Sequence, residues 1–235
     1  LANVRLEGML TVTPQLIRGN GFDLQSDKLK GKVSLLIDLR TGKFDILVSG
    51  GMTRYLIPGL GIVDVRSDLN IVPGPGGKAR VLGKAEAWVR RLDNAFFRDL
   101  TGTLPRLTTD LERTTDGVLH FSNLQLYSRD LRLSGSGIRR RDGTFHIEAT
   151  GRQAKYGPLR MVLDGRIERP RIELLLDRPN EAIDIRAMRL ALDPIAEGYS
   201  YVASGSSRLG LFTSNGRILL PRGAPTVISI AALDV

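Results

Sequence analysis

Residues 131–150 read LRLSGSGIRRRDGTFHIEAT. Apolar residues occupy alternate positions before and after the pair Asp142-Gly143: Leu131, Leu133, Phe145 and Ile147. Alternation with a period of two is typical of a strand with one apolar face. The Asp-Gly pair tolerates the positive backbone dihedrals that a tight hairpin turn requires. The stretch therefore predicts two antiparallel strands with their apolar side chains on one face of a sheet.

The same alternation continues toward the C-terminus, over residues 158–167, 171–177 and 182–193. The apolar residues that share a face in these runs are Leu159, Met161, Leu163, Ile167, Ile172, Leu174, Leu176, Ile183 and Ile185. In the last run the apolar positions shift from odd to even residue numbers, because Ile183 and Ile185 are followed by Met188, Leu190 and Leu192. One extra residue would produce this change, so we expect a β-bulge near Arg186.

Turn signals recur between the apolar runs, and we interpret the 26 glycines mainly as hairpin residues. Pairs similar to Asp142-Gly143 are Asn20-Gly21, Thr41-Gly42, Asp116-Gly117, Asp164-Gly165 and Asn215-Gly216. A weak repeat places apolar residues two and four positions after Gly42, Gly117, Gly143 and Gly216. Any antiparallel protein can show this pattern. The chain is therefore expected to be all-β, with about a dozen mostly short strands in series.

One segment departs from the strand pattern. Val89, Leu92, Phe96 and Leu100 have helical spacing, and Gly102 and Pro105 would end the helix. We expect a short amphipathic helix over residues 89–101 that packs on, or plugs, one end of the sheet. The alternative is a helix that lies on a membrane surface. Residues 1–235 form one elongated unit in this interpretation, with a possible subdivision into 1–88 and 102–235.

Composition excludes several function classes. The chain has 235 residues, 42% of them hydrophobic, and no cysteine, which excludes disulfides, zinc–cysteine sites, iron–sulfur clusters and a cysteine nucleophile. The formal net charge is +9. Arginines alternate with acids, as in Arg166-Ile167-Glu168-Arg169, so we expect solvated strand faces and no nucleic-acid partner. A weak attraction to anionic lipid headgroups would also suit this charge balance.

The search for catalytic chemistry yields no candidate. His120 and His146 alternate with Phe121 and Phe145, so both histidines are expected to face solvent. Residues 73–78 lack the ending of a phosphate-binding loop, and Gly135-Ser136-Gly137 lies between strands in this interpretation, with no helix to follow it. We expect no enzyme activity, no catalytic residue, no metal and no cofactor.

Several motifs resemble the AsmA/TamB superfamily. Residues 133–137 followed by 142–147 resemble a recurring unit of that superfamily, in which an apolar strand ends in Gly-x-Gly and returns through Asp-Gly-Thr-Phe. The middle region of TamB-type proteins is similar to residues 156–159 with 163–165, to 198–201 with 205–206, and to the expected helix followed by Leu104-Pro105-Arg106-Leu107. The resemblance covers most of residues 79–235 and is weaker before that. The family pattern contains no catalytic residues.

The resemblance implies a long curved antiparallel sheet that forms an open, taco-like groove with an apolar concave face. It implies a periplasmic segment of an inner-membrane-anchored protein in a Gram-negative bacterium. Its implied role is to carry phospholipid acyl chains, or to guide unfolded outer-membrane proteins, toward the outer membrane. A barrel-assembly-type protein of the outer membrane would be contacted through regions outside this segment.

The candidate groove residues are the aliphatic and aromatic side chains on the shared strand face. They are Leu131, Leu133, Phe145, Ile147, Leu159, Met161, Leu163, Ile172, Leu174, Leu176, Ile183 and Ile185. A sheet with one apolar face either packs it on a second sheet or exposes it for binding. The alternative function is therefore a structural or adhesin-like β-repeat module without lipid cargo. The alternation of residues does not decide between the two.

Overall fold

The computed structural model describes residues 4–27, 29–57, 61–93, 95–180, 184–220 and 227–235. The described chain forms one open antiparallel sheet of 17 strands with one short α-helix. The strands are β1 (Arg5–Glu7), β2 (Leu10–Val12), β3 (Leu16–Gln25), β4 (Leu29–Asp38), β5 (Phe44–Ile57), β6 (Gly61–Pro73), β7 (Ala79–Leu92), β8 (Arg106–Arg113), β9 (Leu119–Tyr127), β10 (Leu131–Arg139), β11 (Phe145–Gln153), β12 (Gly157–Gly165), β13 (Arg171–Leu176), β14 (Arg186–Ile195), β15 (Gly198–Ser207), β16 (Gly210–Leu219) and β17 (Val227–Asp234). The helix is α1 (Ala95–Thr101), and the short 3-10 helix η1 (Pro75–Gly77) joins β6 to β7. The expected all-β class and open antiparallel sheet are confirmed.

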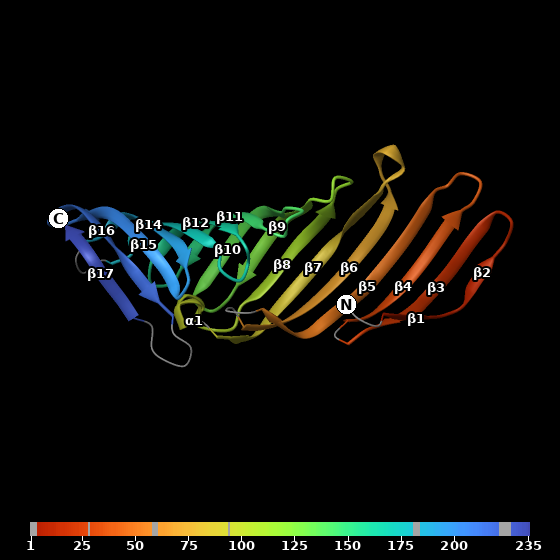
Figure 1. The fold of residues 1–235 in the computed structure, drawn as a ribbon, viewed down its shortest axis with the longest axis horizontal. Coiled ribbons are helices and arrows are strands. Elements are labelled where there is room, and N and C mark those ends of the chain that lie inside the picture. The colour runs from red at the N-terminus through yellow and green to blue at the C-terminus, as the bar shows by residue number, and fades with distance from the viewer. Residues whose placement is uncertain (1–3, 28, 58–60, 94, 181–183, 221–226) are drawn as a thin grey trace.

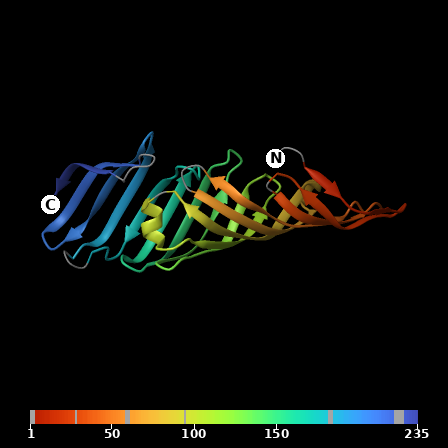
Figure 2. The same cartoon turned by 90° about the horizontal axis from the view of Figure 1, so that it is seen from below.

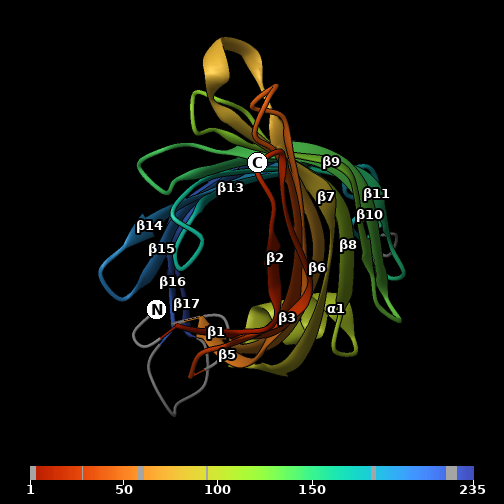
Figure 3. The ribbon, with the colours of Figure 1, turned by 90° about the vertical axis from the view of Figure 1, so that its right-hand side faces the viewer.

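The sheet is a meander, because from β3 onward each strand pairs with the next strand of the chain. β1 and β2 pair with successive parts of β3 and together form the first edge of the sheet. The strands cross the long axis of the molecule obliquely, from the red N-terminal end to the blue C-terminal end (Figure 1). Seen along that axis, the sheet curls without closing (Figure 3). We call the concave side the inner face and the convex side the outer face.

Consecutive turns of a meander lie on opposite long edges of the curl. We call the edge that carries the turns after β4, β6, β8, β10 and β12 the first rim. The opposite edge, which carries the turns after β7, β9 and β11, is the second rim. The strands are long enough to reach from one rim to the other, so their side chains alternate between the inner and outer faces over the whole width. This alternation explains the one-sided sequence pattern.

The helix folds over the inner face instead of extending the sheet. It leaves the second rim after β7 and lies within the curl (Figure 2). Phe97 packs against a buried cluster on β13, β14 and β15, and Leu100 packs against a second cluster on β10, β11, β12 and β13. The Nε2 of Gln153 donates a hydrogen bond to the carbonyl oxygen of Leu100 at 3.3 Å. The helix therefore covers part of the inner face over β10–β15. It packs on the sheet as expected, but between the two ends of the sheet and not at one of them.

The helix begins six residues later than expected. Residues 89–92 belong to β7, whose ladder with β6 continues through Val89 opposite Val63 and Leu92 opposite Gly61. Pairing to a neighbouring strand stabilises this backbone more than a helical turn would, although the apolar spacing fits both. The expected helix over 89–101 is thus wrong in its first half. β7 and β8 pair along residues 81–88, so the sheet runs on without a break beside the helix.

Three of the Gly-containing pairs form the expected turns. Gly42, Gly117 and Gly143 have φ values of 68°, 87° and 86° and lie between consecutive strands. The expectation of a hairpin turn was wrong for two other Gly-containing pairs. Asn20-Gly21 and Asn215-Gly216 lie inside β3 and β16, each at a register shift, where the extra residue is absorbed as a bulge.

The turn at Asp164-Gly165 and the bulge near Arg186 were also expected from the sequence. Asp164-Gly165 closes β12, and the turn follows it at residues 166–170, so Ile167 lies in the turn and not on the strand face as expected. The expected bulge near Arg186 is confirmed, since the β14–β15 register shifts between Arg186 and Arg189 and Ala187 has a φ of 47°. The change of phase in the sequence was therefore a reliable signal of an inserted residue.

Many glycines lie inside strands on the inner face, so the interpretation of glycine as mainly a turn residue was incomplete. Gly135 and Gly137 lie within β10, not between strands as expected. A Cβ at Gly135 would lie 2.0 Å from the carbonyl oxygen of Glu148, and one at Gly151 would lie 1.9 Å from that of Arg132. Side chains crowd one another on the concave side of a curled sheet, and glycine relieves this crowding by allowing close backbone approach. These residues permit the curl.

Candidate functional site

The structure places ten of the twelve candidate groove residues together on the inner face of β10–β13. Cross-strand partners include Leu163 opposite Ile147 and Ile172, and Met161 opposite Leu174. The buried members are Leu131, Leu133, Leu159, Ile172, Leu174 and Leu176. The half-buried members are Phe145, Ile147, Met161 and Leu163. Ile185 is half-buried in an isolated bridge to Asn180 before β14, and Ile183 lies outside the described residues.

The apolar surface extends far beyond these residues. A single row of directly paired inner-face residues crosses the sheet from β3 to β17, and we call it the apolar row. Its members are Phe22, Val33, Val48, Leu69, Gly83, Leu111, Phe121, Gly137, Ile147, Leu163, Ile172, Leu192, Tyr201, Gly216 and Ile230. Every member is apolar or glycine, so a continuous apolar path runs along the molecule.

Sequence reasoning placed no candidate groove residue in the N-terminal half of this path. The signal was present but weaker than in the C-terminal runs, because Phe44, Ile46 and Val48 take alternate positions while Leu47 between them is also apolar. Next to the apolar row, this half carries a line of small residues, with Gly31 opposite Gly50, Gly50 opposite Ser67, and Ser67 opposite Ala85. Small side chains leave the concave surface deeper along this line than large ones would.

The two halves differ in how the inner face is covered. The two buried clusters lie on β10–β15, where α1 covers the sheet. Most inner-face residues of β4–β7 are only half-buried, and no second sheet packs on them in the described structure. Apolar side chains are also exposed near both ends, including Leu10 and Val12 at 52% and 62% and Ile228 and Ile230 at 64% and 60%. Most of the inner face outside the helix contact is therefore open.

The outer face carries most of the charge, arranged as exposed ion pairs. Arg90 contacts Asp64 at 2.7 Å, and Arg106 contacts Glu86 at 2.6 Å. Such exposed pairs contribute little to stability, typically about 0–1 kcal/mol each. Because basic and acidic residues pair on this face, the 34 basic and 25 acidic residues are interspersed along most of the chain, and the run Arg139-Arg140-Arg141 is an exception.

His146 lies on the outer face, as expected, although it has carboxylate partners that the sequence did not indicate. Its Nδ1 lies 2.8 Å from Asp164, and its Nε2 lies 3.4 Å from Glu148. The hydrogen bonds from His146 and then Arg140 lower the pKa of Asp164 below its usual value. The pair forms across β11 and β12, where His146 is directly opposite Asp164, so only the strand register could reveal it. It is too exposed to act as a buried catalytic pair.

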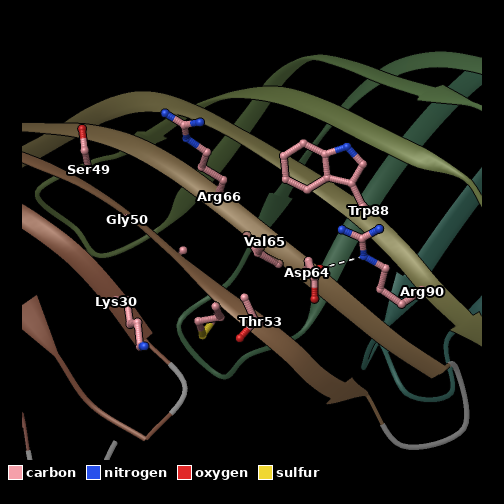
Figure 4. Close-up of a pocket in the computed structure, with 11 residues that line it drawn as sticks. Lys30, Ser49, Gly50, Thr53, Asp64, Val65, Arg66, Trp88 and Arg90 are labelled. Atoms are coloured by element: carbon pink, nitrogen blue, oxygen red, sulfur yellow. Dashed lines mark hydrogen bonds and ion pairs between the residues drawn. The ribbon is translucent and has the colours of Figure 1, made fainter.

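The outer face also contains a shallow pocket of about 430 Å³ between β4 and β7 (Figure 4). Lys30, Arg66 and Trp88 contribute to its lining, and Gly50 and Gly51 leave the space that it occupies. The guanidinium of Arg106 lies over the Trp88 ring, 5.7 Å from its centroid. The pocket lies on the face opposite the apolar row, so it is separate from the candidate groove.

The described residues show neither a metal site nor a membrane-spanning helix. The described ranges contain no group of three or more His, Asp or Glu residues that could hold a metal ion. No helix in the same ranges has both the length and the apolar character needed to cross a membrane. Comparison of the chain with protein-family models, with curated proteins and with solved structures finds no match. The inner face is therefore the feature of the molecule that bears on its function.

Proposed function

We propose that the inner face is a binding groove for the acyl chains of phospholipids, and that the chain serves to hold or conduct lipid without catalysing a reaction. The observation that carries this proposal is the unbroken apolar row from Phe22 to Ile230 on a face that is only partly covered. Monomeric soluble proteins rarely expose large contiguous apolar patches unless they bind something. A face of this length is suited to a long apolar ligand.

The chemistry of the face favours an acyl chain over a protein strand. Each inner strand already pairs on both sides, so its backbone N–H and C=O groups are not available to a cargo strand. An extended peptide on this face would bring its own polar backbone to an apolar surface, which is costly without hydrogen-bond partners. An acyl chain makes only non-directional apolar contacts, each buried CH₂ contributing about 0.8 kcal/mol. The side chains of Leu, Ile and Val and the exposed Cα of Gly supply such contacts without fixing the acyl chain at one position.

The wider setting of the proposal comes from the resemblance to the AsmA/TamB superfamily. In that setting the chain is one periplasmic segment of a bridge between the inner and outer membranes, with the anchor and the outer-membrane contact elsewhere in the protein. The open curl and the lengthwise apolar row support a conduit. A structural module without cargo is the alternative outcome of the test below.

Lipid co-purification tests the proposal with a matched pair of variants on one strand. Val48 lies on the apolar row, whereas Leu47 is 51% exposed on the outer face. The protein is purified from membranes in mild detergent, and bound phospholipid is measured by mass spectrometry. We expect phospholipid with the wild type and with Leu47→Asp, and a large loss with Val48→Asp, because a carboxylate interrupts the apolar path. Val48 is half-buried in an uncovered region, so circular dichroism should show that this variant keeps its strands.

Two outcomes would contradict the proposal. Wild-type protein free of phospholipid, even after incubation with phospholipid vesicles, would favour the structural module. Equal lipid content in Val48→Asp and Leu47→Asp would show that lipid binds elsewhere than on the inner face.

A further inference from the structure

Charge is concentrated at one place among the register-paired inner-face residues of the described strands. Among these residues, Arg113 and Arg139 are the only two with a charged side chain. Both lie next to the first rim, at the ends of β8 and β10. Leu119 of β9 is directly opposite each of them, so the two arginines flank one leucine. The two positive charges are therefore neighbours at the edge of an otherwise uncharged surface.

Aromatic rings join this charged edge to the apolar row. Phe121 and Phe145 are stacked, with centroids 6.0 Å apart and an interplanar angle of 23°. The guanidinium of Arg139 lies over Phe145, 5.8 Å from the ring centroid. Such a cation–π contact leaves the N–H donors of the guanidinium free to bind an anion in the plane of the group. Phe121 is itself a member of the apolar row, so the positive edge and the apolar path are continuous.

A third arginine approaches from the neighbouring hairpin. The Nε of Arg141 and the Nη2 of Arg113 lie 3.5 and 3.9 Å from the point that a Cβ at Gly117 would occupy. Three guanidinium groups thus gather around the hairpins after β8 and β10. None of the three forms an ion pair with a described carboxylate.

The nearest carboxylates are engaged in their own turns. Asp116 accepts hydrogen bonds from the hydroxyl of Thr114 and the backbone N–H of Val118. Asp142 accepts hydrogen bonds from the backbone N–H and the hydroxyl of Thr144, at 2.9 and 2.7 Å. The pKa of Asp116 is lowered by the Thr114 hydroxyl, then by the Val118 N–H, and further by the charge of Arg141, so part of the Arg141 charge is balanced within this hairpin. Arg113 and Arg139, which form no ion pair with a described carboxylate, are therefore the charges most available to an external anion.

We propose that Arg113 and Arg139, assisted by Arg141, bind the phosphate of a phospholipid whose acyl chains lie on the apolar row. This inference rests on the proposed function and names the headgroup position that it requires. A phospholipid has an anionic phosphate joined to apolar chains, and this edge places guanidinium groups beside Leu119, Phe121 and Phe145. Guanidinium forks bind phosphate through two parallel hydrogen bonds and keep their charge at all physiological pH values. The phosphate would lie at the rim in water while the acyl chains follow the concave surface.

A lipid-binding assay with three ligands separates this inference from the proposed function. The ligands are phosphatidylglycerol, diacylglycerol with the same acyl chains, and glycerol phosphate without acyl chains. Purified protein is titrated with each ligand in detergent solution, and dissociation constants are measured. We expect the double variant Arg113→Gln, Arg139→Gln to bind phosphatidylglycerol about tenfold more weakly than the wild type, equivalent to about 1.4 kcal/mol. Its affinity for diacylglycerol should be unchanged.

The control removes the same charge from the other side of the sheet. Arg132 and Arg152 are exposed, directly opposite each other on the outer face, and without an ion pair to a described residue. The double variant Arg132→Gln, Arg152→Gln should bind phosphatidylglycerol as the wild type does. A loss equal to that of the inner-face variant would show a general effect of net charge and would overturn the headgroup site.

Each of the three other outcomes of the binding assay leads to a different conclusion. Binding of diacylglycerol together with an unchanged phosphatidylglycerol affinity in the inner-face variant would overturn the headgroup site and leave the groove intact. Glycerol phosphate binding as tightly as phosphatidylglycerol would identify a free-phosphate site instead. Failure of the wild type to bind any acylated ligand would overturn both the groove and the headgroup site.

Discussion

Replacing Leu174 by aspartate tests the assignment of the two faces, because its chain neighbour Leu175 provides a matched control. Leu174 is 5% exposed on the inner face of β13, in the cluster with Ile172, Leu192 and Tyr201. Leu175 is 42% exposed on the outer face. The two variants have the same composition and net charge, so a difference between them reports the environment alone.

The expected cost at Leu174 has two parts. Loss of a buried leucine side chain costs about 2–5 kcal/mol in packed cores. A carboxylate placed in the same cluster adds a desolvation cost of at least about 2 kcal/mol. We therefore expect Leu174→Asp to lower the free energy of unfolding by about 5 kcal/mol. Leu175→Asp should change it by less than about 1 kcal/mol, because the carboxylate would lie opposite Arg160 and Arg189.

The destabilisation should depend on pH with a defined sign. Burial raises the pKa of the introduced carboxyl group in the folded state, so the neutral form is tolerated and the charged form is not. The loss should be smallest below about pH 4, where the unfolded carboxyl is also protonated, and should grow as the pH rises toward 7. Leu174→Asn removes the same apolar contacts without a titrating group, so its cost should stay constant over this range.

Urea unfolding followed by circular dichroism measures these differences. With a slope of about 2–3 kcal/mol per molar urea, a loss of 5 kcal/mol lowers the midpoint by about 2 M. Equal midpoints for Leu174→Asp and Leu175→Asp at pH 7 would refute the assignment of a buried inner face. A cost that is the same at pH 4 and pH 7 would refute the low-dielectric environment proposed for the cluster.

Three further predictions follow from single contacts. Phe97→Ala should lower the free energy of unfolding by about 2 kcal/mol and speed amide hydrogen exchange in β13–β15, because the ring packs on that cluster; unchanged exchange would show that α1 does not protect these strands. Gly135→Val should lower the free energy of unfolding by more than about 2 kcal/mol, because its Cβ would lie 2.0 Å from a backbone oxygen. The control Ser136→Val on the outer face should lower it by less than about 0.5 kcal/mol. Equal melting temperatures for the two variants would contradict the role of glycine in the curl. Asp164→Asn should lower stability by about 0.5 kcal/mol at pH 7, because the side chain is 44% exposed and its pairs are screened. The pKa of Asp164 is lowered by His146 and then Arg140, so this contribution is present above about pH 4 and fades as the pH falls further; a difference from the wild type that persists at pH 2 would contradict it.

Local signals in the sequence were sufficient where the physical cause was local. A side chain that alternates every second residue shows its face directly, so Leu131, Leu133, Leu159 and Leu174 could be assigned to one face before any strand pairing was known. The phase change near Arg186 marked a bulge for the same reason. The pairs Asp116-Gly117 and Asp142-Gly143 marked hairpins because their backbone conformations are set within a few residues.

Local signals failed where two interpretations had the same spacing. Val89 and Leu92 fit a helix as well as a strand, and the ladder between β6 and β7 decided for the strand. Gly216 has the same sequence neighbourhood as a turn glycine, yet it lies opposite Tyr201 inside the sheet. In both cases the deciding partner is far away in the chain, so no window of neighbouring residues contains the information.

The sequence by itself determined that this protein is a series of antiparallel strands with one apolar and one charged face. Only the tertiary structure decided that the apolar faces join into one lengthwise row, that glycines such as Gly135 and Gly151 permit the curl, and that α1 covers only part of the surface. It also brought Arg113 and Arg139 to the two sides of Leu119. The physical reason is that alternation is a property of a single strand, whereas depth, cover and charge clustering arise from strand register and sheet curvature, which depend on contacts between distant residues.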